Sequence, residues 1–340
     1  MRNSNILVII LIFFNIFSVL QSVGICGAED EKTLTVRSDG NGNYTSIQDA
    51  IDAASPGDTV YVWSGTYYEP LIVNKTINLI GEDKNTTILD CNNYGYSAIR
   101  IQAFNVTISS FTIQNSTTGI YIEGNDIRPN NITITDTIIT KNKGGIFLGN
   151  LSNNNFICRN VIIGNIGDGI RLFGSHNNFI YENNIEKHEN FAIVLWDSSY
   201  SNVISQNTIL NNKNGIGLKR WSDNNNISDN TITGNRKLGI SLSYSFRNIL
   251  LGNSISNSST GIYLGDSSEN VISANYIAYN HRGIYLYDAT GNIIDEDNVF
   301  LGNDEDISEG SKTFKIPGFE LVLIICAMLF VLLCKRKISI

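Results

Sequence analysis

Residues 261–286 read GIYLGDSSENVISANYIAYNHRGIYL, and this stretch contains the same short pattern, Gly-Ile-Tyr-Leu, twice. The first copy begins at Gly261 and the second at Gly283, 22 residues later. Working outward, related Gly-Ile-x-Leu/Ile copies begin at Gly119, Gly145, Gly169, Gly215 and Gly239, and an Ala-Ile-Val-Leu copy at Ala192 fills the one gap. Successive copies lie 22 to 26 residues apart. A nearly fixed period of this length indicates a repeat architecture.

Each repeat contains three short segments of β-type sequence. In Gly261-Ile-Tyr-Leu264 the apolar residues alternate with an outward one, which is typical of a strand with one buried face. Two series of asparagines, each followed within one or two positions by an apolar residue, run in step with the glycines: Asn131, Asn155, Asn178, Asn202, Asn226, Asn248, Asn270 and Asn292, and then Asn160, Asn184, Asn207, Asn230, Asn253, Asn275 and Asn298. Asparagine and glycine tolerate the positive φ that sharp corners require.

Three strands and three corners in 22–24 residues make one coil of a parallel β-helix. We therefore predict an all-β solenoid of about 11 coils, counted from Val60, in a rod roughly 50 Å long. Isoleucine would stack on isoleucine and corner asparagine on asparagine, forming amide ladders. Leucine-rich repeats and β-propellers are excluded because the first need helical segments and the second need longer repeats. Thr45–Gln48 has the form of a capping box, so we expect a short N-terminal helix that covers the open core.

The N-terminal part of the chain resembles a known family opening. The resemblance lies in Ser46–Val62 (SIQDAIDAASPGDTVYV), Ser64–Tyr67 (SGTY) and Asn78–Gly81 (NLIG). These segments are similar to the start of pectin-lyase-like β-helix proteins, particularly the NosD-like, CASH-domain (carbohydrate-binding and sugar hydrolase) group. With the repeats, the resemblance covers residues 33 to about 305. It implies a right-handed coil and a family that includes polysaccharide lyases, esterases, hydrolases, epimerases and non-catalytic members.

The two ends of the chain predict export and membrane attachment. Residues 1–28 resemble a secretory signal peptide cleaved near Ala28, with an uncleaved signal anchor as the alternative. Residues 313–340 contain 14 apolar residues, Leu321–Cys334, and then a basic cluster, so we expect the β-helix domain 29–312 to lie outside the cell. Pro317-Gly318-Phe319 before this run resembles the PGF-type C-terminal sorting signal of archaeal surface proteins. A retained transmembrane anchor is the alternative.

Charge and sulfur content limit the partners. Residues 29–315 hold 20 basic and 31 acidic residues, a net charge of about −11, which argues against nucleic acid as a partner. Cys91 and Cys158 are the only cysteines there, so no disulfide framework is expected. NosD-like relatives are associated with copper handling, but both methionines lie in the excluded ends. Because soft thioether ligands are missing, we expect no metal and no cofactor, and copper handling remains a disfavoured alternative.

The outward positions of the Gly-Ile-x-Leu strands form two lanes in which aromatic and charged residues gather. Aromatic faces beside hydrogen-bonding groups suit a sugar ring, although aromatic residues also simply suit strands. The candidate ligand-binding residues are Phe173, Trp196, Trp221, Tyr244, Tyr263, Tyr285 and Tyr287. The candidate catalytic residues, if the chain is an enzyme, are Asp168, Arg171, Asp197, Lys219 and Arg220. The aspartates would act as acid and base, while Arg171 or Lys219 would neutralise a uronate carboxylate.

The local motifs of polygalacturonase-like hydrolases, alginate epimerases and pectin esterases, as the family shows them, are absent from the sequence. We therefore favour a non-catalytic, membrane-anchored surface protein that binds polysaccharide or envelope components. A lyase or hydrolase acting on acidic glycans and a purely structural envelope rod are the alternatives. An exported protein also offers its Asn-x-Ser/Thr sites to glycosylation. These sites are Asn43, Asn74, Asn85, Asn105, Asn115, Asn131, Asn150, Asn226 and Asn257.

Overall fold

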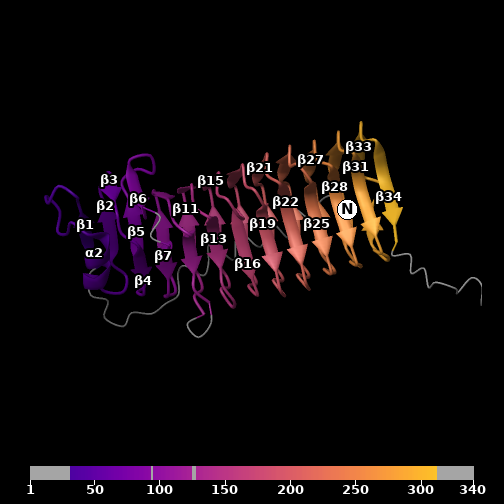
Figure 1. Ribbon diagram of the computed structural model, residues 1–340. Coiled ribbons are helices and arrows are strands. Elements are labelled where there is room, and N and C mark those ends of the chain that lie inside the picture. The colour runs from indigo at the N-terminus through magenta and orange to yellow at the C-terminus, as the bar shows by residue number, and fades with distance from the viewer. Residues whose placement is uncertain (1–30, 93–94, 125–127, 312–340) are drawn as a thin grey trace, which may run out of the picture.

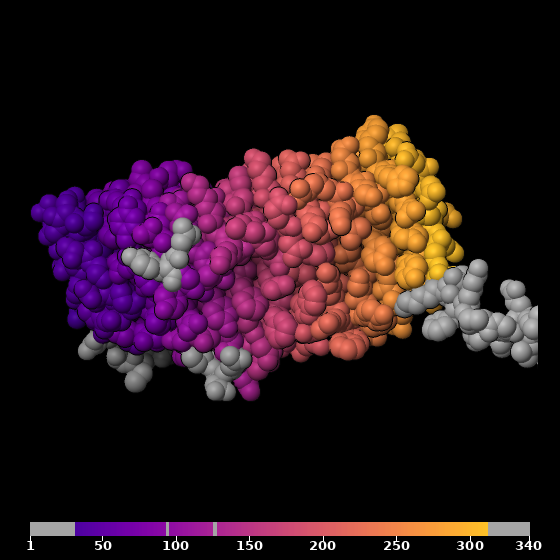
Figure 2. All heavy atoms as spheres, viewed as in Figure 1, coloured from indigo at the N-terminus to yellow at the C-terminus, as the bar shows by residue number. Residues whose placement is uncertain are grey.

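The computed structural model describes residues 31–92, 95–124 and 128–311, which form a rod of stacked coils (Figure 1). The chain runs along the rod from one end to the other, as the colour sequence in Figure 2 shows. Three parallel sheets follow the rod axis, two of 11 strands and one of 12. The predicted all-β parallel solenoid is therefore confirmed, with about 12 turns. The predicted signal peptide, 1–28, and the predicted C-terminal anchor, 313–340, lie outside the described residues.

Each coil contributes one strand to each of three sheets, which we name A, B and C. Sheet A consists of β1 (Thr33–Val36), β2 (Thr59–Val62), β5 (Asn78–Gly81), β8 (Thr107–Ser109), β11 (Thr133–Thr135), β14 (Phe156–Cys158), β17 (Phe179–Tyr181), β20 (Val203–Ser205), β23 (Asn226–Ser228), β26 (Ile249–Leu251), β29 (Val271–Ser273) and β32 (Ile293–Ile294). Sheet B consists of β3 (Gly65–Tyr67), β6 (Thr87–Asp90), β9 (Thr112–Gln114), β12 (Ile138–Thr140), β15 (Val161–Ile163), β18 (Asn184–Glu186), β21 (Thr208–Leu210), β24 (Thr231–Thr233), β27 (Ser254–Ser256), β30 (Tyr276–Ala278) and β33 (Val299–Leu301). Sheet C consists of β4 (Leu71–Val73), β7 (Ser97–Ile101), β10 (Thr118–Ile122), β13 (Gly144–Leu148), β16 (Ile170–Phe173), β19 (Phe191–Trp196), β22 (Asn214–Lys219), β25 (Leu238–Ser243), β28 (Thr260–Gly265), β31 (Arg282–Tyr287) and β34 (Glu305–Gly310).

The N-terminal end of the core is covered by α2 (Ile47–Ala53), as the sequence predicts. Ile47 and Ile51 are fully buried, and the Ser46 hydroxyl accepts the first capping hydrogen bond from a backbone amide. The Gln48 side chain pairs with the backbone of Ile72 on β4, the edge strand of sheet C. This pairing occupies an exposed strand edge that would otherwise be available to another chain. One element was not predicted: β1, which pairs with β2 and begins sheet A one strand earlier than Thr59.

The core is a continuous column of isoleucine and leucine. In sheet C, Ile193, Ile216 and Ile240 lie opposite one another in register and are completely buried. Burial of each such side chain stabilises the fold by about 1.5–3 kcal/mol. Because each coil has the same inward residues, the core repeats without a break along the rod. Among the described residues, no helix is long and apolar enough to cross a membrane.

Amide ladders at the corners confirm the predicted asparagine stacking. At one corner, the Asn202 amide and side chain both donate to Asn225 Oδ1, at 2.8 and 3.1 Å. At the next, Asn207 donates to Asn230 Oδ1 in the same way, at 3.0 Å for both bonds. A third corner, which the sequence pattern did not single out, carries Asn142, Asn165, Asn212, Asn235 and Asn280. Fully paired buried amides of this kind hold each coil in one register.

The predicted ladder was wrong at three of its positions. Asn183 and Asn225, and not Asn184 and Asn226, point inward and accept from the preceding coil. In each pair the second asparagine begins a strand of sheet B or A. Two consecutive asparagines give the local pattern no means of choosing between them. Asn131 also lies outside the ladder, because the amide of the next residue donates to Asn155.

Candidate functional site

The outward face of sheet C holds two lanes of side chains in the predicted register. Tyr121 lies opposite Phe147 in the first lane, and Phe173 lies opposite Trp196 in the second. The remaining neighbours in the first lane are Phe147–Arg171, Arg171–Val194, Val194–Gly217, Gly217–Ser241, Ser241–Tyr263 and Tyr263–Tyr285. The rings of Tyr121 and Phe147 are stacked, with centroids 5.2 Å apart. The strand register therefore brings together residues about 25 positions apart in the chain.

Three cations surround Trp196, the last residue of β19. Lys219 Nζ is 5.0 Å from the indole centroid and 4.4 Å from the ring centroid of Phe191. The guanidinium carbons of Arg171 and Arg220 are 5.9 and 5.2 Å from the indole centroid. A cation over an aromatic face contributes about 0.5–1 kcal/mol at exposed sites and more when desolvated. Neighbouring coils thus combine their side chains into one cluster, which we call the Trp196 cluster.

Both candidate acid–base carboxylates are held in ion pairs beside this cluster. Asp168 Oδ2 lies 3.1 Å from Arg171 Nε, and Asp168 Oδ1 accepts a hydrogen bond from the backbone amide of Phe191. Asp197 Oδ1 lies 3.7 Å from Arg220 Nη1. The structure therefore gathers the five candidate catalytic residues in one neighbourhood. It gives each aspartate an arginine partner, and their catalytic role stays a prediction.

Lys219 differs from an ordinary surface lysine. Burial between the rings lowers the pKa of Lys219, while the Asp168 carboxylate opposes this shift and the Arg171 guanidinium adds to it. Phe191 can lie flat beneath the lysine because Gly217 has no side chain. A Cβ at position 217 would lie 2.6 Å from Phe191 Cε1. The platform under Lys219 therefore depends on a glycine in the neighbouring coil.

A second aromatic group lies farther along the same face. The rings of Tyr263 and Tyr285 have centroids 5.8 Å apart, and those of Tyr285 and Tyr287 are 6.4 Å apart. The Arg282 guanidinium lies 4.5 Å from the Tyr285 centroid and pairs with Glu305 at 3.6 Å. Three of the seven candidate binding residues are thus adjacent to one another.

The remaining candidate binding residues lie at, or just after, the C-terminal ends of individual sheet C strands. Phe173, Trp221 and Tyr244 expose 39%, 60% and 49% of their surface, so their rings are accessible from solvent. Trp221 and Tyr244 have φ of 60° and 51°, because the corner that follows each sheet C strand turns through the left-handed region. Beside them, the ring of His176 stacks on Tyr200 with centroids 4.6 Å apart. This edge of the face is therefore rich in exposed rings.

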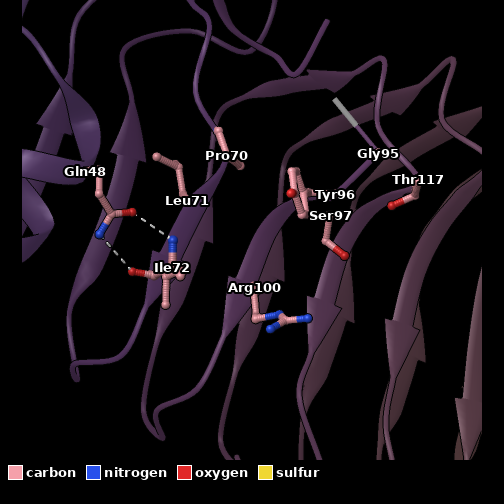
Figure 3. Close-up of a pocket in the computed structure, with 9 residues that line it drawn as sticks. All are labelled: Gln48, Pro70, Leu71, Ile72, Gly95, Tyr96, Ser97, Arg100 and Thr117. Carbon is pink, nitrogen blue, oxygen red and sulfur yellow. Dashed lines mark hydrogen bonds between the residues drawn. The ribbon is translucent and has the colours of Figure 1, made fainter. Parts of the chain in front are cut away.

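Two pockets lie along the N-terminal half of sheet C. The larger has a volume of about 550 Å³ and is lined by Gln48, Pro70, Leu71, Ile72, Gly95, Tyr96, Ser97, Arg100 and Thr117. Figure 3 shows the Gln48 amide paired with Ile72 at one side of this pocket, Thr117 at the other side, and Arg100 between them. The second, of about 350 Å³, is lined by Thr117, Thr118, Lys143, Gly144, Gly145, Ile146, Phe147, Gly167, Asp168, Arg171 and Asn190. Thr117 borders both pockets, so they are neighbours on one face.

Sequence reasoning missed several residues of this face. Phe191 was not singled out because it precedes the Ala192 repeat copy, at a position where most other coils have a polar residue or glycine and one has Leu238. The signal that points to it is Gly217, an outward position of sheet C without a side chain. Arg100 was also missed, although it lies opposite Tyr121 in the first lane and over its ring. Lys143 was missed too, because it is linked to the lanes only through the second pocket.

The nine candidate glycosylation sites differ in exposure. Seven asparagines are exposed: Asn43, Asn74, Asn85, Asn105, Asn131, Asn150 and Asn257. Asn115 and Asn226 are half-buried. The Asn115 amide donates to both oxygens of Asp90, so attachment of a sugar there would break these bonds. The exposed seven therefore remain the better candidates.

Parts of the chain match two protein-family models and a curated relative. Residues 201–316 match the family model described as periplasmic copper-binding protein (NosD), and residues 97–253 match that of the right-handed β-helix region. A cell surface glycoprotein of Methanothermus fervidus is 33% identical over 125 residues, which are 36% of this chain and 19% of that protein. The match thus spans about a fifth of the curated relative.

The donor atoms of the described residues do not fit a copper site. The ring nitrogens of His188 are buried against the backbone carbonyls of Asn165 and Ile162, and His281 pairs with Asp304. Cys91 and Cys158 are buried free thiols. Across residues 31–92, 95–124 and 128–311, no three His, Cys, Asp or Glu side chains gather closely enough to hold a metal ion. Residues 201–311 of the NosD match belong to the coils of the described solenoid.

Solved structures share the architecture at low sequence identity. The Dettilon tailspike protein superposes with a TM-score of 0.61 at 16% identity, covering 77% of this chain and 63% of that one. The A-module of the Azotobacter vinelandii mannuronan C-5 epimerase AlgE4 gives 0.55 at 19% identity, covering 78% and 94%. These likenesses show the fold alone. With the two family matches and the cell surface relative, they show that this chain contains a NosD-like right-handed β-helix domain with distant homology to an archaeal cell surface glycoprotein.

Proposed function

We propose that this chain is an exported, membrane-anchored surface protein that binds polysaccharide or other envelope components on the outward face of sheet C, without catalysis. The observation that carries the proposal is the concentration of cation–aromatic contacts. Of the seven such contacts among the described residues, six lie on this face. The seventh, between Arg37 and Trp63, lies near the N-terminal end.

The chemistry of this face suits a sugar. The C–H face of a pyranose ring packs on an aromatic ring, whose electron-rich face attracts the weakly positive hydrogens. The hydroxyl groups of the sugar then need hydrogen-bonding partners nearby. Trp196 offers an indole next to Arg171 and Arg220, and both pockets lie on the same sheet. Exposed rings on one face of a protein commonly mark a binding surface.

The proposal of a non-catalytic role is supported by the state of the carboxylates. Glycoside hydrolysis needs one carboxyl group that donates a proton and one that acts as a base. Asp168 and Asp197 are instead each paired with an arginine. Asp168 also accepts a hydrogen bond from the Phe191 amide at the start of β19, and the Asp197–Arg220 pair joins two successive corners, so both carboxylates have structural contacts.

The proposed location is supported by the relatives and by the ends of the chain. The curated relative is named a cell surface glycoprotein, and the matching family is described as periplasmic. The apolar run Leu321–Cys334 is followed by Lys335-Arg336-Lys337, which favours an anchor with the β-helix outside the cytoplasm. The Pro317-Gly318-Phe319 motif further favours processing as in PGF-type sorting.

A glycan array with the full-length chain in detergent tests the proposal. We expect binding to a subset of polysaccharides, at least about tenfold weaker in Trp196→Ala, with no product formed on prolonged incubation. Tyr276→Ala is the matched control, because Tyr276 is an exposed aromatic residue on sheet B. Product formation that Asp197→Asn abolishes would show an enzyme instead. Absence of binding to every glycan and to isolated envelope material would refute the binding function.

A further inference from the structure

The charge balance of the sheet C face differs from that of the chain. The whole chain has a net charge of −8. Between β7 and β22, the relevant charged side chains are those that contact the rings of this face, those that form ion pairs with them, and those that line the second pocket. They comprise five cations and three carboxylates. They are Arg100, Lys143, Arg171, Lys219 and Arg220, against Glu123, Asp168 and Asp197. The face therefore carries about two positive charges on an acidic protein.

The ion pairs show which cation remains available. Arg171 pairs with Asp168 at 3.1 Å, and Arg220 pairs with Asp197 at 3.7 Å. Among the described residues, no carboxylate oxygen lies within 4.0 Å of Lys219 Nζ, which is the distance limit for an ion pair. Two of the three cations around Trp196 are thus neutralised within the protein. Lys219 is the one with no carboxylate within ion-pair distance among the described residues, and the Asp168 carboxylate acts on it only from farther away.

The position of Lys219 strengthens the electrostatic interaction that its charge can make with an anionic ligand. Its ammonium group lies over Phe191 and Trp196, in a half-buried place where water screens it less than on an open surface. Burial lowers the pKa of Lys219, because the charged ammonium group loses contact with water. A nearby anion would offset this desolvation cost. A sugar ring packed on Trp196 would bring its substituents next to this ammonium group.

We propose that Lys219 makes the Trp196 cluster selective for anionic glycans, whose carboxylate or sulfate group would pair with its ammonium group while the sugar ring packs on Trp196. This inference rests on the proposed polysaccharide-binding function and names its ligand class. Arg171 and Arg220 position the indole and remain bound to their aspartates. Lys219 is therefore the residue that distinguishes charged from neutral sugars, and Trp196 serves both.

Three polymers test the selectivity on the full-length chain in detergent: polygalacturonate, the same polymer with its carboxyl groups reduced to alcohols, and dextran sulfate. We expect polygalacturonate or dextran sulfate to bind at least about tenfold more tightly than the reduced polymer. Lys219→Gln should remove most of that preference, because it removes the charge and keeps the length of the side chain. Lys219→Arg should retain it. Lys187→Gln is the control, since Lys187 follows β18 on another sheet and pairs with Glu186.

The two anionic polymers separate the sources of charge: tighter binding of polygalacturonate assigns a carboxylate, and tighter binding of dextran sulfate assigns a sulfate. Equal affinity for the charged and reduced polymers, or a Lys219→Gln variant that keeps the preference, would overturn the inference and leave the proposed function intact. Failure of the unmodified chain to bind any of the three, or any glycan on the array, would overturn both. Circular dichroism of Lys219→Gln checks that the coil is intact, so that lost selectivity is assigned to the charge.

Discussion

The adjacent residues Asn183 and Asn184 offer a direct test of the ladder. Asn183 is buried, and its Oδ1 accepts from both the amide and the side chain of Asn160, at 3.1 and 3.0 Å. Its Nδ2 donates to the Ile157 carbonyl at 2.8 Å. Asn184 points outward from β18, and its Oδ1 is buried without a hydrogen-bond partner. The same substitution at these neighbouring positions should therefore have very unequal consequences for stability.

The size of the effect follows from the groups left unpaired. Asn183→Ala deprives the Asn160 amide of its acceptor and the Ile157 carbonyl of one donor, while the Asn160 side chain keeps its bond to another carbonyl. Each buried polar group without a partner costs about 1–3 kcal/mol, so we expect a loss of about 2–6 kcal/mol. Asn184→Ala removes an oxygen that has no partner and should change the stability by less than about 0.5 kcal/mol.

Urea unfolding of the full-length chain in detergent, followed by circular dichroism, measures both variants. Because a long solenoid need not unfold in one step, hydrogen exchange of the amides in β15, β18 and β21 should accompany the midpoints. We expect these amides to exchange faster in Asn183→Ala and at the original rate in Asn184→Ala. If Asn183→Ala unfolds at the same urea concentration as the unmodified chain, or if both variants lose equal stability, the ladder does not stabilise the coil as reasoned here.

Three further outcomes are expected. Gly217→Ala should weaken glycan binding several-fold and reduce stability by about 1–3 kcal/mol, because the added Cβ displaces the Phe191 ring under Lys219. Unchanged affinity on the glycan array would contradict this. Burial lowers the pKa of His188 below the ordinary histidine value of about 6.5, and the neighbouring carbonyls, Asp168 and Glu186 oppose this shift. The stability that the neutral ring contributes should therefore be complete above about pH 6.5 and fall as the pH drops through the lower folded-state value. His188→Asn, which supplies the amide found at equivalent corners, should flatten the melting temperature between pH 7.5 and 5.5, and an unchanged slope would show that His188 is not the titrating group. Tyr285→Ala should weaken binding only of glycans long enough to reach both ring clusters, which a comparison of short and long oligosaccharides on the same array measures.

Periodicity predicts this fold well because every coil repeats the same inward residues. Once Gly261 and Gly283 are aligned, the register of Tyr263 with Tyr285 follows, and the structure has that register. The terminal element was harder to predict: β1 (Thr33–Val36) lies before the repeats begin, and 22 residues that include α2 separate it from β2. A periodic pattern contains no information about a strand that joins the sheet from outside the period.

The site was less predictable than the fold because its members contact one another through side-chain reach. The strand register places Trp196 beside Phe173, but the approach of Arg220 to the indole depends on a corner whose shape the repeat does not determine. His188 shows the same limit. It lies in a charged run of sequence, yet the structure buries it at a ladder position between Asn165 and Asn212. Local polarity therefore did not predict burial.

Small differences between coils explain why the cluster forms at this place on the rod. Asn202 follows Leu195 by seven positions, and the next coil has the same spacing, whereas Asn248 follows Leu242 by only six. Of the three corners with seven-position spacing, those after Leu195 and Leu218 have two consecutive residues with positive φ, whereas the corner after Leu148 does not. Trp221 is one of these residues. The ladders and the inward leucines keep their register, so the extra residue must be accommodated outside the core. It widens the corner directly beside Trp196, where Arg220 can turn back over the indole. An extra residue outside the core thus shapes the proposed binding edge, and deleting Trp221 should remove this edge while leaving the asparagine ladder intact.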